Sequence, residues 1–176
     1  LKKVKDLFIF SCYTGVSYAD LMLLTPQNLV IGIDKKFWII TRREKNGNQV
    51  KLPLLSKAIS LIEDYKHDQG CLLNNSLLPT LSNQKINSYL KEIAEKCLIE
   101  KNLTFHLARH TFATTVALTN GVPIETVSKI LGHKKLSTTQ IYAKVIERKV
   151  SEDMELLQQK LNSKASGNPP ELQKHL

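Results

Sequence analysis

Hydrophobic positions recur at helical spacing through most of the chain, and short β-branched runs interrupt this pattern only near the N-terminus. Apolar side chains that recur every three or four residues predict helices with one buried face. The predicted helices are residues 2–13, 18–24, 56–69, 82–97, 104–120, 123–132, 137–142 and 152–161.

Three short segments between the second and third of these helices are rich in β-branched and aromatic residues, which favours strands. They are residues 29–33, 37–41 and 49–53, with tight turns at Asp34-Lys35 and at Lys45–Asn48. Asn46-Gly47 is a strong hairpin signal because both positions tolerate positive φ. The sequence therefore predicts an α+β, mainly helical fold with a small three-stranded antiparallel sheet near the N-terminus.

The length and composition indicate one globular domain. The 176 residues are 42% hydrophobic and 23% charged, which excludes a disordered or fibrous chain. No apolar run approaches the roughly 18 residues that span a membrane, and three cysteines without a CxxC pair favour reduced thiols. We therefore expect a cytoplasmic protein without a membrane segment.

The ends of the chain differ from its middle. Leu1 stands where a complete protein has Met, so we expect the chain to begin within a longer protein. After Ser163, the run Gly167–Pro170 is typical of an unstructured end. This predicts a domain at 1–163 and a flexible tail at 164–176.

Basic residues are in excess. Lys and Arg number 25 against 16 Asp and Glu, which gives a formal charge of +9. Such a charge favours a polyanionic partner such as nucleic acid, because neutralising phosphates releases counterions. Charge alone also fits a basic surface without a partner.

Polar residues cluster at the start of the predicted helix 104–120. His106 and Arg109 lie on neighbouring parts of its first turn, where free backbone N–H groups favour an anion, although the same pair also suits a solvated helix start. His106 and His110 have the spacing of two zinc ligands, but an arginine between ligands opposes a cation, and no glutamate accompanies them. We therefore expect no metal site, and expect His110 to be a buried, hydrogen-bonded residue that fixes helix packing.

A second cluster follows nearer the C-terminus. Leu131-Gly132-His133 ends one predicted helix, Lys134-Lys135 follows, and Tyr142 stands nine residues after His133. The order His-x-x-Arg, Leu-Gly-His and Tyr resembles the catalytic domain of the tyrosine recombinases, the phage-integrase family. Thr104–Thr115 resembles the second box of that family and Leu131–Tyr142 the third.

The resemblance extends upstream to about residue 7. Tyr13–Leu21 resembles the first box, and Lys45 stands on the hairpin where the family places its catalytic lysine. The amino-acid sequence of the first box, with Tyr-x-Asp after Thr-Gly, is most similar to that of integrases of conjugative transposons and related mobile elements. The resemblance implies the tyrosine-recombinase catalytic-domain fold, without the N-terminal DNA-clamping domain that such proteins usually carry.

The resemblance also implies a mechanism. Tyr142 attacks a DNA phosphodiester and forms a 3′-phosphotyrosyl link, which a partner strand later resolves. Arg109 holds the nonbridging oxygens, His106 and His133 donate to phosphate or move protons, and Lys45 protonates the leaving 5′ oxygen. No cofactor or metal is implied. Lys134, Lys135 and Arg43 are expected to contact the DNA, and the partners are double-stranded DNA and other protomers, as a tetramer on DNA from a chain that is monomeric when free.

One position departs from the family pattern. Ser17 stands where the first box normally carries an arginine, so half of the phosphate clamp is missing from its expected place. We expect a nearby cation to replace it, and the candidates are Lys5, Arg42 and Arg43. Alternatively, the enzyme is slow by design or has lost catalysis.

Two alternatives to a recombinase remain open from sequence. Residues 117–131 superficially resemble a helix-turn-helix, as in a DNA-binding regulator that cuts nothing. A type IB topoisomerase shares the tyrosine chemistry. The apolar stripe of Met154, Leu157 and Leu161 suits packing on the chain's own core or on a neighbouring protomer.

Overall fold

The computed structural model describes residues 1–143 and 147–165, which fall into two separate units. The first unit is Leu1–Ala143 and contains the sheet and all the predicted site residues. The second begins at Lys144, and its described part is one helix. The domain boundary predicted at residue 163 stays a prediction. Residues 166–176 of the predicted tail lie outside the described part of the chain.

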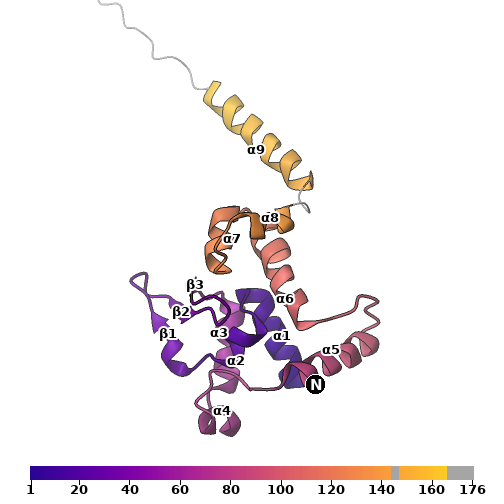
Figure 1. The fold of residues 1–176 in the computed structure, drawn as a ribbon. Coiled ribbons are helices and arrows are strands. Elements are labelled where there is room, and N and C mark those ends of the chain that lie inside the picture. The colour runs from indigo at the N-terminus through magenta and orange to yellow at the C-terminus, as the bar shows by residue number, and fades with distance from the viewer. Residues whose placement is uncertain (144–146, 166–176) are drawn as a thin grey trace, which may run out of the picture. The chain divides into compact units, whose positions relative to one another are not determined.

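Helices dominate the described residues, as predicted (Figure 1). In chain order the elements are α1 (Lys2–Thr14), α2 (Tyr18–Met22), η1 (Pro26–Asn28), β1 (Leu29–Ile31), β2 (Phe37–Arg42), β3 (Gln49–Pro53), α3 (Ser56–Tyr65), α4 (Gln69–Leu73), α5 (Asn83–Lys96), α6 (Phe105–Thr111), the π-helical η2 (Phe112–Ala117), η3 (Leu118–Asn120), α7 (Ile124–Ile130), α8 (Ser137–Ala143) and α9 (Glu147–Ala165).

The three strands form one antiparallel sheet in the order β1-β2-β3, which confirms the predicted sheet. Ile39 in the central strand is opposite Leu29 on one side and Leu52 on the other. β1 ends at Ile31, two residues earlier than predicted, because the Gly32 N–H donates to the Lys36 carbonyl and closes the turn.

Two predicted helices are broken. The segment predicted at 56–69 ends at Tyr65, because the Asp68 side chain accepts the Cys71 N–H at 3.1 Å and caps a new short helix, α4. The segment predicted at 104–120 changes from α to π at Phe112. The last helix is longer than predicted, since α9 spans Glu147–Ala165 rather than 152–161.

The core of the first unit forms around α1. Leu7 and Phe10 of this helix are completely buried, and α1 packs against α3, α5 and α6. The sheet contributes Ile39 to the same core. Gly15 ends α1 in the left-handed conformation, as the Thr14-Gly15 signal predicts. A Cβ there would approach Phe112 at 2.5 Å, so only glycine allows α1 and η2 to meet this closely.

The three cysteines are free thiols in this structure. Cys12 and Cys71 are buried, and Cys97 is exposed. Burial raises the pKa of Cys12 to about 11, so this thiol stays protonated at neutral pH. Cys12 and Cys71 therefore act as small core residues.

The sequence predicts a chain without a membrane segment. In the part of the chain that the structure describes, no helix combines the length and apolarity required to cross a bilayer.

Candidate active site

The first turn of α6 is held by its neighbours. Thr104 directly precedes the helix, and its side chain makes no capping bond. The Asn87 side chain on α5 instead accepts the Phe105 N–H at 2.8 Å. Phe105 and Ala108 are buried, so this packing fixes the direction in which His106 and Arg109 leave the helix.

Arg109 connects the three sequence boxes. This buried guanidinium donates to the Gly15 carbonyl at 2.6 Å and to the Leu131 carbonyl at 2.5 Å. Its Nη2 also lies 3.2 Å from Nε2 of His133. Burial, and then repulsion from Arg43, lowers the pKa of Arg109 to about 10, so the group is still a cation at neutral pH. Arg109 is therefore oriented before any substrate is present.

His133 lies between Arg109 and α8. Its Nδ1 is 2.8 Å from the hydroxyl of the buried Thr139. Burial, together with the positive charges of Arg109 and Arg43, lowers the pKa of His133 to about 4. The ring is therefore neutral at neutral pH, with Nε2 as acceptor from Arg109 and Nδ1 as donor to Thr139.

Tyr142 packs among histidines. Its ring is 4% exposed and lies edge-on to His110, with 4.9 Å between the ring centroids. The ring of His133 stacks on it at 6.5 Å. His110 is half-buried and its ring also contacts His106, so it does pack the helices together, but it is less buried than predicted.

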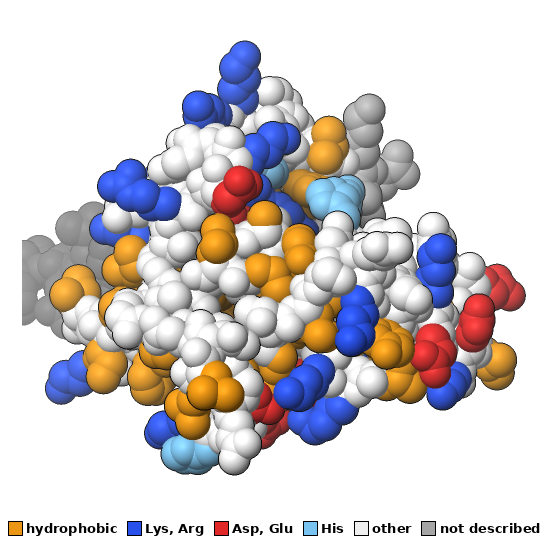
Figure 2. Space-filling view, turned by 60° about the horizontal axis from the view of Figure 1, so that its bottom comes forward, with side chains coloured by type: hydrophobic (Ala, Val, Ile, Leu, Met, Phe, Trp, Pro, Cys, Tyr) orange, Lys and Arg blue, Asp and Glu red, His pale blue; other side chains and the backbone are white. Residues whose placement is uncertain are grey.

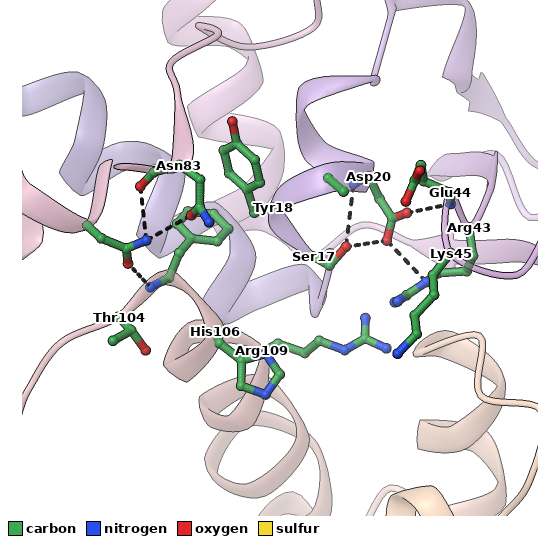
Figure 3. A pocket seen from close by; sticks show the side chains of 13 residues that line it. Ser17, Tyr18, Asp20, Arg43, Glu44, Lys45, Asn83, Thr104, His106 and Arg109 are labelled. Atoms are coloured by element: carbon green, nitrogen blue, oxygen red, sulfur yellow. Dashed lines mark hydrogen bonds and ion pairs between the residues drawn. The ribbon is translucent and has the colours of Figure 1, made fainter. Parts of the chain in front are cut away.

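The predicted catalytic side chains share one region of the surface. Two pockets, of about 480 and 490 Å³, overlap there. The residues that line both include Arg43, Lys45, His106 and Arg109, and those of the second also include His133, Lys134 and Tyr142. In Figure 3 the side chains of Arg43, Lys45 and Arg109 extend toward the same space. The structure thus brings together residues from four separate parts of the sequence.

The hairpin that carries Lys45 is tied to the third box. The side-chain amides of Asn46 and Asn48 both donate to the Gly132 carbonyl at 3.2 Å. Gly132 has a φ of +64°, and a Cβ there would approach Cγ of Arg43 at 2.7 Å. These contacts place the exposed Lys45 in the pocket that Tyr142 also lines.

Ser17 has a local structural role. It caps α2, and its hydroxyl donates to Asp20 Oδ2 at 2.6 Å. Asp20 is buried and also accepts the Glu44 N–H at 2.9 Å. Asp20 stands in the first box, but no role was predicted for it. The available signal was its position three residues after Ser17, where a carboxylate faces the helix N-terminus.

The three candidate replacement cations lie in different places. Nζ of Lys5 is 3.4 Å from Oδ1 of Asp6 on α1, and Arg42 is exposed at the end of β2. Neither Lys5 nor Arg42 is among the described residues that line the two pockets. Arg43 lines both, and its Nε forms an ion pair with Asp20 Oδ2 at 3.2 Å.

Basic side chains border the pockets. Lys134 and Lys135 are exposed in the loop between α7 and α8. On the face in Figure 2, Lys and Arg side chains gather in the upper part, next to a histidine. Among the described residues, no group of three or more His, Cys, Asp or Glu side chains is placed to hold a metal ion.

Comparison with known proteins identifies similar sequences and folds. The model of the "Phage integrase family" matches residues 3–149. Tyrosine recombinase XerD of Staphylococcus saprophyticus is 31% identical over 150 residues, which cover 78% of this chain and 48% of that protein. Tyrosine recombinase XerC of Listeria monocytogenes is 37% identical over 91 residues, covering 52% of this chain and 30% of that protein. The chain thus spans less than half the length of these curated relatives.

Solved structures share the fold. The crystal structure of XerA recombinase matches with a TM-score of 0.62 and 25% identity, over 80% of this chain and 57% of that one. The Tn1549 transposon integrase in complex with circular intermediate DNA matches with a TM-score of 0.63 and 19% identity, over 80% and 53%. The predicted tyrosine-recombinase catalytic-domain fold is confirmed, and its similarity to integrases of mobile elements holds at the level of the fold.

Proposed function

Because the chain belongs to the phage integrase family, we propose that it is the catalytic part of a site-specific DNA recombinase. It breaks and rejoins DNA strands through a 3′-phosphotyrosyl intermediate, for integration or excision of a mobile element. The observation that supports this most strongly is that Tyr142 shares a pocket with a buried arginine, two histidines and a lysine.

Each of these groups has a task in phosphoryl transfer. The Tyr142 oxygen forms a bond to phosphorus as the bond to the 5′ oxygen breaks. Lys45 gives a proton to that leaving oxygen, and the phenol proton passes to a neighbouring base. Arg109 meets the charge that develops on the nonbridging oxygens with its positive charge and with the N–H groups that its bonds to Gly15, Leu131 and His133 leave free. The bond energy is kept in the phosphotyrosyl link, so the step consumes no nucleotide.

The histidines differ in what they offer to the phosphate. His106 is exposed at the first turn of α6 and is free to donate to a nonbridging oxygen. His133 is neutral and already accepts from Arg109, so it positions that guanidinium beside Tyr142. Two imidazoles at one phosphate thus have separate roles.

The partner that fits this site is double-stranded DNA. A formal charge of +9 and the exposed Lys134 and Lys135 beside the pocket favour a phosphate backbone. The similar XerH recombinase was solved with its difH substrate after cleavage, and a lambda integrase as a dimer on a core site. We extend this to several protomers, a tetramer in the full reaction, acting on DNA in the cytoplasm.

The test is capture of a covalent adduct. The chain is incubated with a pool of duplexes of randomised sequence, each with a nick that lets the cleaved strand diffuse away. Wild-type protein is expected to give a complex that survives denaturing gel electrophoresis, and sequencing its DNA identifies a preferred site. Tyr142→Phe is expected to remove the adduct completely, because the nucleophilic oxygen is gone.

Tyr89→Phe is the matched control, since Tyr89 is a half-buried tyrosine on α5 that is not among the described residues lining either pocket. Salt-labile complexes without any adduct would instead support the regulator. Relaxation of supercoiled DNA without site preference would support the topoisomerase. An adduct that persists in Tyr142→Phe would show that another residue is the nucleophile.

A further inference from the structure

The first-box position leaves a gap in the clamp around the phosphate. The hydroxyl of Ser17 is committed to the buried Asp20, at 2.6 Å, and the Asp20 N–H returns a weaker bond to Ser17 at 3.4 Å. A serine held this way supplies no positive charge to the pocket. A reaction that gains charge on the nonbridging oxygens therefore requires a second cation from elsewhere in the fold.

Arg43 brings a second guanidinium to the place where Arg109 lies. Its Nη1 donates to the Leu131 carbonyl at 3.1 Å, which is the same oxygen that accepts from Nη2 of Arg109. Two guanidinium groups on one carbonyl oxygen lie within a few ångströms of each other. Both side chains line both pockets, with Lys45 and His106.

Three separate contacts fix Arg43. Its Nε forms the ion pair with Asp20, Nη1 reaches the Leu131 carbonyl, and its aliphatic stem packs where Gly132 has no side chain. In Figure 3 Ser17, Asp20 and Arg43 form one connected chain of contacts. In the described part of the chain, neither the ion pair nor the carbonyl contact uses Nη2 of Arg43, which leaves its two N–H groups to a ligand.

The charges at this point do not balance without an anion. Arg43, Arg109 and Lys45 are three cations around the shared pockets, against two carboxylates, Asp20 and Glu44, that line the first pocket and not the second. Asp20 is buried and already accepts from Ser17 and from the Glu44 N–H. Two like charges held this close repel each other unless a negative group lies between them. A phosphate provides that group, with one nonbridging oxygen for each guanidinium.

We propose that Arg43, held by Asp20, supplies the guanidinium that the first box lacks at Ser17, and that it holds a nonbridging oxygen of the scissile phosphate together with Arg109. This inference rests on the proposed function and names a further catalytic residue for it. Arg43 directly follows β2, whereas Ser17 lies in the turn after α1. The second guanidinium thus comes from a different part of the chain, and Asp20 contacts both Arg43 and Ser17.

The first experiment measures cleavage of the duplex selected by the wild-type chain. Arg43→Ala is expected to lower the rate of adduct formation on the order of 10² to 10³, as for the loss of one oxyanion donor. Arg42→Ala, one residue away and exposed, is the matched control and is expected to stay within a few-fold of wild type. Equal rates for Arg43→Ala and wild type would overturn the proposal.

A structural role for Arg43 makes a different prediction. If Arg43 only neutralised Asp20, then Asp20→Asn combined with Arg43→Met would restore both folding and cleavage. Our proposal expects this pair to restore the melting temperature but not the rate. Replacing the scissile phosphate by an uncharged methylphosphonate is a further readout, because Arg43→Ala should then lose at least tenfold less than it loses on the natural phosphate. An undiminished loss would mean that Arg43 acts only through the fold.

The second experiment requires no DNA and so separates this inference from the proposed function. The chain contains four arginines, and the Nε–Hε signals of Arg43 and Arg109 are followed by NMR as sulfate is added. Both signals are expected to shift with one dissociation constant, and Arg43→Ala to weaken sulfate binding at Arg109 at least fivefold. A shift of the Arg109 signal alone, unchanged in Arg43→Ala, would refute the shared clamp even if the wild-type chain cleaves DNA.

Discussion

The protonation state of His133 is a property of its surroundings rather than of the residue. Isolated histidine titrates near 6.5, whereas burial and two guanidinium groups lower the pKa of His133 to about 4. Between these values the unfolded chain binds a proton that the folded chain does not. Acid therefore favours the unfolded state, and the contribution of His133 to stability is lost as the pH falls from 6.5 to 4.

The corresponding prediction concerns the slope of stability against pH. His133→Gln keeps a group that accepts from Arg109 but carries no proton equilibrium. The free energy of unfolding of the wild type should fall more steeply between pH 6.5 and 4 than that of His133→Gln, while the two curves run parallel above about pH 7. Urea denaturation followed by circular dichroism measures both. Parallel curves over the whole range would show that folding does not lower the pKa of His133.

Single residues were predictable from the sequence where a motif marks them. Tyr142, Arg109, His106 and His133 stand in recognisable boxes, and the structure brings them to one pocket. The residues that support them were missed. The side chains of Asn46, Asn48 and Asn87 bind backbone groups far away in the chain, and a single amide carries no periodic signal that reveals such a partner.

At the scale of elements, two close backbone approaches assemble the site. Gly15 lets α1 contact η2, and Gly132 lets the end of α7 contact Arg43 and Val50. We predict that Gly132→Ala disrupts the site strongly, although the substitution adds only one methyl group. Left-handed backbone costs an alanine about 1–2 kcal/mol, and displacing Arg43 and Val50 adds about 1–3 kcal/mol. Thermal unfolding and adduct formation measure the two effects.

Gly47 offers the matched control for that substitution. It has nearly the same φ, +70°, but nothing lies within 4 Å of a Cβ built there. Gly47→Ala should therefore show the backbone cost alone and keep most of the cleavage activity. Equal losses for the two variants would mean that backbone strain, and not the contact with Arg43, explains the effect at Gly132.

Elements themselves were predicted well where one signal acted alone. The sheet and α1, α5, α7 and α8 fall where hydrophobic spacing and turn residues place them. The errors occur where two signals compete. Asp68 caps a helix inside a segment whose apolar spacing continued, and the π-helical turn after Thr111 keeps helical spacing while shifting the face that each residue occupies.

The whole molecule consists of two units whose sequence character differs. The first buries a continuous core, whereas the described residues of α9 expose Val150, Met154, Leu157 and Leu161 at 46–64%. These apolar positions repeat every three or four residues along the helix, which is the spacing of a contact face. Exposed apolar faces of this kind favour association.

We therefore predict that the chain self-associates through α9 at high concentration. Leu157→Glu with Leu161→Glu should lower the fraction of dimer or higher species in sedimentation velocity at least fivefold. The paired control, Gln158→Glu with Gln159→Glu, changes the charge by the same amount on exposed polar positions and should have little effect. Identical sedimentation of the two variants would show that this stripe makes no contact between protomers.

The two asparagine bonds to the Gly132 carbonyl determine where the segment that carries Tyr142 is anchored. Tyr142 is buried and α8 begins at Ser137, so if the tyrosine turns outward to reach DNA we expect the upstream pivot within residues 133–136. That stretch contains Lys134 and Lys135. DNA phosphates bound by these two lysines would therefore act directly on the segment that leads to Tyr142.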